Sequence, residues 1–96
     1  MDDLMRESLR LCVLRLVNEA PGRTANESVL HASVDRFGFK VSRDQLATEL
    51  YWLKEQGALT LGTIADLRVA TGNQSTEDIV NDRKSVPGIQ RPSPKD

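Results

Sequence analysis

VSRDQLATELYWLKEQGALT, residues 41–60, carries the signals of a helix start, a buried helix face and a helix end. Ser42 and Gln45 have the spacing of a capping box, in which two side chains satisfy free backbone N–H groups at a helix start. Gly57 stands where a left-handed residue ends a helix without strain. The expected core face consists of Leu46, Leu50 and Leu53. The stretch therefore predicts a helix that runs to about Gln56.

Two further helices are expected before this stretch. Residues 4–20 have a helical apolar period, which Pro21 and Gly22 end. Thr24 and Glu27 again have the capping-box spacing, which predicts a second helix over residues 25–37. The chain up to residue 56 is therefore expected to form three helices.

The chain after this stretch changes character. Residues 58–61 and 66–70 favour β-structure and flank a short link, which predicts an antiparallel hairpin. A weaker polar helix is expected to start at Ser75 or Thr76 and to reach Lys84. Residues 85–96 hold three of the four prolines and show no helical or strand period. They are expected to form an extended tail.

The order of helix, helix, helix and β-hairpin resembles a winged helix-turn-helix domain, and residues 41–60 resemble the recognition helix and first wing strand of ArsR-type and MarR-type regulators. The resemblance implies a mostly α-helical fold with a small β-hairpin: a three-helix core, a two-stranded wing, a short C-terminal helix and an extended tail. The winged-helix domain is then expected over residues 1–84, and the proline-rich basic tail over residues 85–96.

The whole chain also resembles a family of small proteins of Mu-like bacteriophages that are often labelled ArsR-like. The residues that carry this likeness are 9–16, 19–22, 30–31, 41–45, 52–53 and the closing VPGIQRPSP of residues 86–94. The resemblance implies a phage protein from the neighbourhood of late packaging and head genes. A likeness in fold says nothing by itself about DNA binding.

Composition excludes several classes of function. The chain has 13 basic and 14 acidic residues, so it is no polycation and any nucleic-acid site must be a local patch. Cys12 and His31 are the only residues of their kinds, so one chain is expected to hold no disulfide, metal or cofactor. No arrangement of catalytic residues is apparent, which predicts a non-enzyme without a small-molecule substrate. The acidic N-terminus and the short apolar run of residues 11–14 predict no membrane segment and a place in the cytoplasm of the host bacterium.

The candidate DNA contacts centre on the helix of residues 43–56, because the N-terminal half of a recognition helix enters the major groove. Arg43 is a candidate for a guanine edge and Tyr51 for the DNA backbone. Asp44 and Glu55 oppose this interpretation because carboxylates repel phosphates. The full set of expected contacts is Lys40, Ser42, Arg43, Gln45, Thr48, Tyr51, Arg68, Arg83, Lys84 and Arg91. Together with Lys95, the last three make the stretch from residue 83 to 95 basic without an acid.

Apolar residues outside the expected core suggest a partner surface. Leu4, Leu11 and Leu14 form a second stripe on the first helix, which is covered either by the fold itself or by a homodimer partner. Trp52 lies off the core face, where it is covered by the hairpin or docks a partner. Residues 86–94, from the same chain or a second copy, are a candidate ligand for Trp52.

Two hypotheses about function follow. The first is a phage-encoded, dimeric winged-helix protein that binds double-stranded DNA in regulation or packaging. The alternative is a winged helix that has become a protein-interaction module in phage packaging or head assembly. The acid-bearing outer face of the third helix favours the alternative, and the fold type favours DNA binding.

Overall fold

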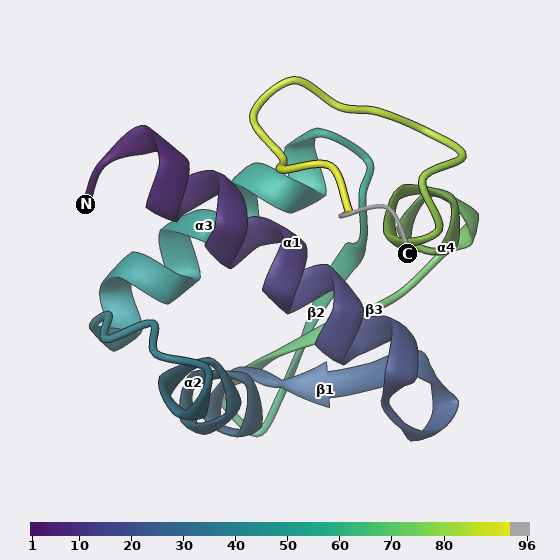
Figure 1. Ribbon diagram of the computed structural model, residues 1–96. Helices are drawn as coiled ribbons and strands as arrows, with labels where there is room; N and C mark the ends of the chain where they lie inside the picture. The colour runs from purple at the N-terminus through teal and green to yellow at the C-terminus, as the bar shows by residue number, and fades with distance from the viewer. Residues whose placement is uncertain (93–96) are drawn as a thin grey trace.

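The computed structural model describes residues 1–92, where four helices and the β-hairpin follow one another as expected and a short strand, β1, is added before the second helix (Figure 1). Over these residues the chain forms a small α/β domain with four α-helices and a three-stranded antiparallel sheet. The elements are α1 (Asp3–Glu19), a short 3-10 turn (Pro21–Arg23), β1 (Thr24–Asn26), α2 (Glu27–Arg36), α3 (Arg43–Glu55), β2 (Thr60–Ile64), β3 (Leu67–Thr71) and α4 (Gln74–Val80). This arrangement is compatible with a winged helix.

Helix α3 forms as its sequence signals predict. The Gln45 backbone N–H donates to Ser42 Oγ at 3.0 Å, and the Ser42 N–H donates to Gln45 Oε1 at 2.9 Å, which confirms the capping box. The helix ends at Glu55, and Gly57 follows with a φ of 74°. The three leucines of the predicted core face, Leu46, Leu50 and Leu53, are fully buried.

The predicted start of the second helix is wrong. Asn26, rather than Thr24, caps α2, and its side chain accepts a hydrogen bond from Val29 N at 2.9 Å. Residues 24–26 form β1, which pairs with β3 in the register Thr24↔Thr71, Ala25↔Ala70 and Asn26↔Val69. The strand order is therefore β1-β3-β2, and the expected two-stranded hairpin is part of a three-stranded sheet.

The hairpin of β2 and β3 is longer than the sequence indicates. Pairing continues to Ile64↔Leu67, so the turn consists of Ala65 and Asp66 rather than residues 62–65. Both turn residues have positive φ, 51° and 66°, which matches the backbone of a tight two-residue hairpin turn.

Helix α4 also differs from its prediction at both ends. Asn73 caps it instead of Ser75 or Thr76, and it ends at Val80 instead of Lys84. Thr76 is fully buried, where its hydroxyl donates to the Ala58 carbonyl and accepts from Asn73 N. Thr76 therefore ties α4 to the segment that leads into β2.

The core includes both apolar stripes of α1. The buried residues of α1 are Leu9, Leu11, Val13, Leu14 and Val17, because α1 packs against both α2 and α4. Leu11 and Leu14 are thus part of the chain's own core, and their assignment to a homodimer surface is wrong. Leu4, the third residue of that stripe, is exposed.

Residues 85–92 are not the extended tail that the sequence predicts. This segment returns from α4 toward α1 and α3 (Figure 1). The Ile89 N–H donates to the Val86 carbonyl at 3.0 Å in a turn, and the Ile89 side chain joins the core. Gln90 accepts a hydrogen bond from the Ser8 hydroxyl at 2.6 Å. The segment up to Gln90 therefore belongs to the domain, and Lys95 lies outside the described residues.

Candidate nucleic-acid interface

The outward side of α3 carries the main candidate contacts. Arg43, Thr48 and Tyr51 are all exposed on it, as the helix spacing predicts. The Thr48 hydroxyl donates to the Asp44 carbonyl at 3.0 Å, so Thr48 lies along the helix surface. Asp44 is exposed as well, which leaves a carboxylate among the candidate contacts.

Arg68 joins this face from the sheet. Its guanidinium lies 5.4 Å from the centre of the Tyr51 ring, and its Nε donates to the Tyr51 hydroxyl at 3.3 Å. Its Nη1 donates to Glu27 Oε2 at 2.7 Å. Arg43 also reaches Glu27, with Nη2 3.7 Å from Oε1, and donates to the Ser28 hydroxyl at 3.2 Å. The start of α2 thus connects α3 with β3.

Glu27 has a different role from the one that its spacing to Thr24 predicts. It was expected to close a capping box with Thr24, but its side chain is only 8 % exposed and holds two arginines. These partners, Arg43 and Arg68, stand 16 and 41 residues further along the chain. No local spacing signals contacts at such separations, so this role is apparent only in the folded chain.

The pKa of Glu27 is lowered, first because its carboxylate accepts a hydrogen bond from the Arg68 side chain. A carboxyl group with a lowered pKa in the folded state stabilises the fold above its unfolded pKa. This stabilisation is lost as the pH falls through the pKa that Glu27 has in the folded state.

We therefore expect Glu27→Gln to lower the melting temperature at neutral pH, and the gap to wild type to narrow as the pH drops below the ordinary glutamate pKa of 4.5. Thermal unfolding followed by circular dichroism between neutral pH and about pH 3 measures this gap. If the difference in melting temperature between the two proteins stays the same over that pH range, the ionised Glu27 carboxylate does not stabilise the fold through its arginine partners.

The remaining candidates at the start of α3 are engaged in local structure. The Ser42 and Gln45 side chains form the capping box described above. Lys40 lies before α3, with its Nζ 3.0 Å from Asp35 Oδ2. These three residues lie at one end of the candidate face, but their side chains already have partners within the chain.

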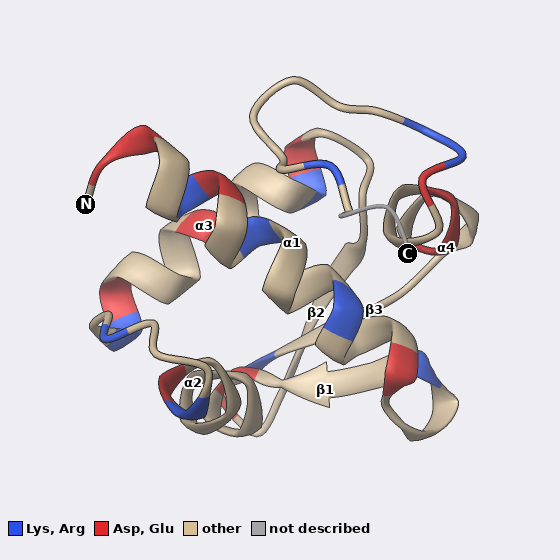
Figure 2. Ribbon diagram, in the orientation of Figure 1, with Lys and Arg blue, Asp and Glu red and all other residues tan. Residues whose placement is uncertain are grey.

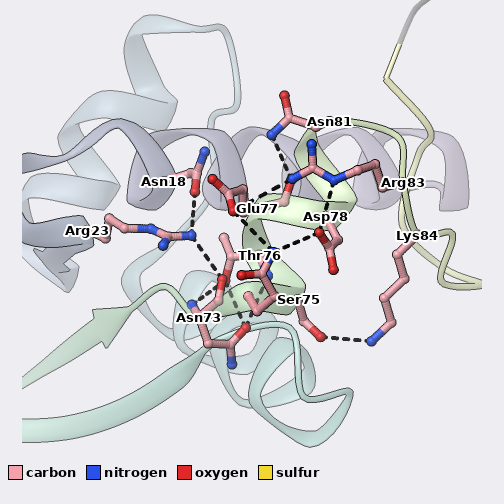
Figure 3. A network of polar contacts seen from close by, with 11 residues as sticks. Asn18, Arg23, Asn73, Ser75, Thr76, Glu77, Asp78, Asn81, Arg83 and Lys84 are labelled. Atoms are coloured by element: carbon pink, nitrogen blue, oxygen red, sulfur yellow. Dashed lines mark hydrogen bonds and ion pairs between the residues drawn. The ribbon is translucent and has the colours of Figure 1, made fainter.

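The basic side chains of residues 83–91 have partners within the folded chain, acids for Arg83 and Arg91 and a hydroxyl for Lys84. Arg83 pairs with Asp78 at 3.1 Å, and Lys84 Nζ donates to Ser75 Oγ at 2.8 Å (Figure 3). Arg91 pairs with Asp82 at 3.1 Å. These groups lie around α4, which Figure 1 places well away from the start of α3. They do not join the candidate face, because acids before residue 83 in the sequence fold back onto them.

Charge is mixed over the rest of the molecule. Basic and acidic residues are interspersed along α1 (Figure 2). The face formed by α3 and β3 therefore stands out by its arrangement, not by a large excess of charge.

Trp52 is partly buried and lies against Gly88, in the segment of residues 85–92. A Cβ added at Gly88 would stand 2.8 Å from two Trp52 ring carbons, so only glycine fits there. The Arg10 guanidinium lies 3.7 Å from the centre of the Trp52 ring and donates to the Gly88 carbonyl at 2.9 Å. Residues 86–94 of the same chain or of a second copy were the candidate ligand for Trp52, and in the structure Gly88 of the same chain lies against it.

The structure offers no metal centre within residues 1–92, where no three His, Cys, Asp or Glu side chains gather closely enough to hold an ion. None of the helices in this part of the chain has the length and apolar character needed to cross a membrane.

Two proteins are similar to the chain in sequence. The uncharacterized protein gp26 of Escherichia phage Mu is 33% identical over 95 residues, which cover 99% of the chain and 98% of gp26. An uncharacterized protein of Haemophilus influenzae is 44% identical over 64 residues, which cover 67% of the chain and 62% of that protein. No protein-family model and no solved structure matches the chain.

Proposed function

The chain belongs to the family of the phage Mu protein gp26, and we propose that it is a phage winged-helix protein that binds double-stranded DNA. The observation that carries the proposal is that α3 and β3 present Arg43, Tyr51 and Arg68 on one face. A recognition helix and a wing strand are the elements that contact DNA in such domains. Acting in the host cytoplasm, such a protein serves in transcription regulation or in DNA packaging.

The arrangement of the two arginines supports this face. Arg43 and Arg68 share the single acid Glu27, whereas Arg83 and Arg91 each pair with an acid of their own. With the exposed Asp44 the charges of the face sum to zero, so its support is the position of the two guanidinium groups and not a net charge. An exposed basic group that contacts a phosphate displaces counterions from the DNA, and their release increases the affinity of the protein for DNA. The exposed Asp44 lowers the affinity for DNA. As an acid in the first turn of α3, it stabilises the helix by its interaction with the positive end of the helix dipole.

A double variant tests the proposal. We expect Arg43→Ala/Thr48→Ala to weaken binding to a labelled duplex by about tenfold to a hundredfold, which corresponds to a loss of about 1.4 to 2.8 kcal/mol of binding free energy. Fluorescence anisotropy at about 50 mM salt measures the dissociation constant. The matched control, Arg83→Ala/Ser75→Ala, removes the same kinds of group from α4 and the segment that follows it, and is expected to leave the affinity almost unchanged. Equal losses in the two variants would overturn the assignment of the face.

A second candidate function, protein interaction in packaging or head assembly, is favoured by one apolar groove. The groove has a volume of about 340 Å³ and runs along the outer side of α1, where Cys12, Leu16, Phe37 and Phe39 line it. Phe37 is exposed, and an exposed aromatic side chain is typical of a protein interface. Failure of the wild-type protein to bind any duplex would favour this second function.

A further inference from the structure

Glu27 lies beneath two guanidinium groups that come from different elements. Its side chain is 8 % exposed, whereas those of Arg43 and Arg68 are 50 % and 36 % exposed. Oε2 accepts from Arg68 Nη1 at 2.7 Å, and Oε1 lies 3.7 Å from Arg43 Nη2. Oε1 also accepts from the Arg68 backbone N–H at 3.5 Å. Both oxygens of one buried carboxylate thus hold basic groups at the surface.

The two guanidinium groups keep donors for a further ligand. Arg68 uses Nη1 for Glu27 and Nε for the Tyr51 hydroxyl, which leaves Nη2 without a partner in residues 1–92. Arg43 bonds to Ser28 through Nη2, so in the same part of the chain its Nε and Nη1 have no hydrogen-bond partner. A guanidinium group binds phosphate oxygens through several N–H groups at once. The unpaired donors suit an anion approaching from solvent.

We propose that Arg43 and Arg68 form a two-armed clamp for one phosphate of the DNA backbone, with Glu27 as the positioning residue. This inference rests on the proposed function and deepens it. Both arms already reach the same carboxylate, so they are close enough for one phosphate to contact both. Arg43 then contacts the backbone and not the guanine edge that the sequence suggested. The clamp adds affinity without sequence preference.

The number of phosphates that the protein neutralises can be obtained from the way its affinity for DNA depends on the salt concentration. The slope of log K against log salt changes by about 0.9 for each phosphate contact. We expect the Arg43→Ala/Arg68→Ala variant to lose about 0.9 in slope, because both arms hold the same phosphate. Each single variant is expected to bind less tightly with a smaller loss of slope, and Arg83→Ala is the control that keeps the wild-type slope.

Three outcomes of this titration are informative. A loss of about 1.8 in the double variant would mean two separate phosphates and would overturn the clamp. An unchanged slope in a protein that still binds would also overturn it, while the proposed function would stand. No binding by the wild-type protein would instead refute the proposed function, on which the clamp depends.

The role of Glu27 is tested by its coupling to the arginines. Glu27→Gln is expected to lower the affinity about threefold or more in the wild-type background, because the two arms lose the carboxylate that positions them, and to have almost no effect when both arginines are alanine. Melting temperatures of all the variants check that each one is folded at the assay temperature. An equal effect of Glu27→Gln in the two backgrounds would show that it acts through net charge or overall structure and not through the arginines.

Discussion

Ile89→Ala is expected to lower the free energy of unfolding by about 3 kcal/mol. The Ile89 side chain is 5 % exposed and packs into the core, so its removal loses apolar burial and leaves a cavity. A loss of this size is a large fraction of the total stability of about 5 to 10 kcal/mol that is usual for a domain of this length. Urea unfolding followed by Trp52 fluorescence measures it, and Trp52 contacts the same segment through Gly88.

Ile64 offers a matched control for this prediction. It lies at the end of β2 with 67 % of its surface exposed, so Ile64→Ala makes the same chemical change without opening a cavity. Its effect is expected to stay within about 0.5 kcal/mol. Equally small effects at both positions would mean that residues 85–92 do not pack on the core in solution.

Arg10→Ala is expected to destabilise the fold by about 3 kcal/mol, because it strands a buried carboxylate. Arg10 Nε lies 2.6 Å from Glu49 Oε1, and the two side chains are only 12 % and 9 % exposed. Arg6 approaches Glu49 at 3.5 Å but is far more exposed, so it compensates only in part. The same substitution also loses the Trp52 stacking and the bond to the Gly88 carbonyl.

A double-mutant cycle with Glu49→Ala isolates the Arg10 and Glu49 pair. We expect the double variant to lose much less stability than the two single losses combined, since the second substitution removes the stranded charge. Arg83→Ala is the comparison for an exposed ion pair, and it is expected to change stability very little. Additive losses of Arg10→Ala and Glu49→Ala would contradict an interaction between the two residues.

Helix α3 could be predicted because every signal that defines it is local. Ser42 and Gln45 are three residues apart, and the buried leucines recur at helical spacing. The exposed positions of Arg43 and Tyr51 follow from the same spacing. The part of the candidate interface that α3 contributes could therefore be predicted from the sequence.

Strand β1 and the C-terminal segment could not be predicted, because distant partners determine them. Residues 24–26 contain two good capping residues, and only pairing with β3 shows that Asn26 is the cap. Ile89 stands among prolines and glycine without any period, so nothing local indicates that it is buried. Long-range pairing overrode the local preference at both places.

The composition of the interface shows the same division. Arg68 lies in a strand, and its place beside Tyr51 depends on how the sheet meets α3. Arg83 and Arg91 have the right charge for a DNA contact, yet acids that precede them in sequence pair with them after folding. Charge counted along the chain thus misjudged the C-terminal stretch, and only the folded arrangement separates paired from available cations.

The binding of a labelled random-sequence duplex to the wild-type protein tests the proposed function most directly. Fluorescence anisotropy is recorded at about 50 mM and about 200 mM salt. We predict binding at the lower concentration that weakens steeply at the higher one, as phosphate contacts require. No binding at the lower salt concentration would contradict the proposal that the face of α3 and β3 contacts DNA.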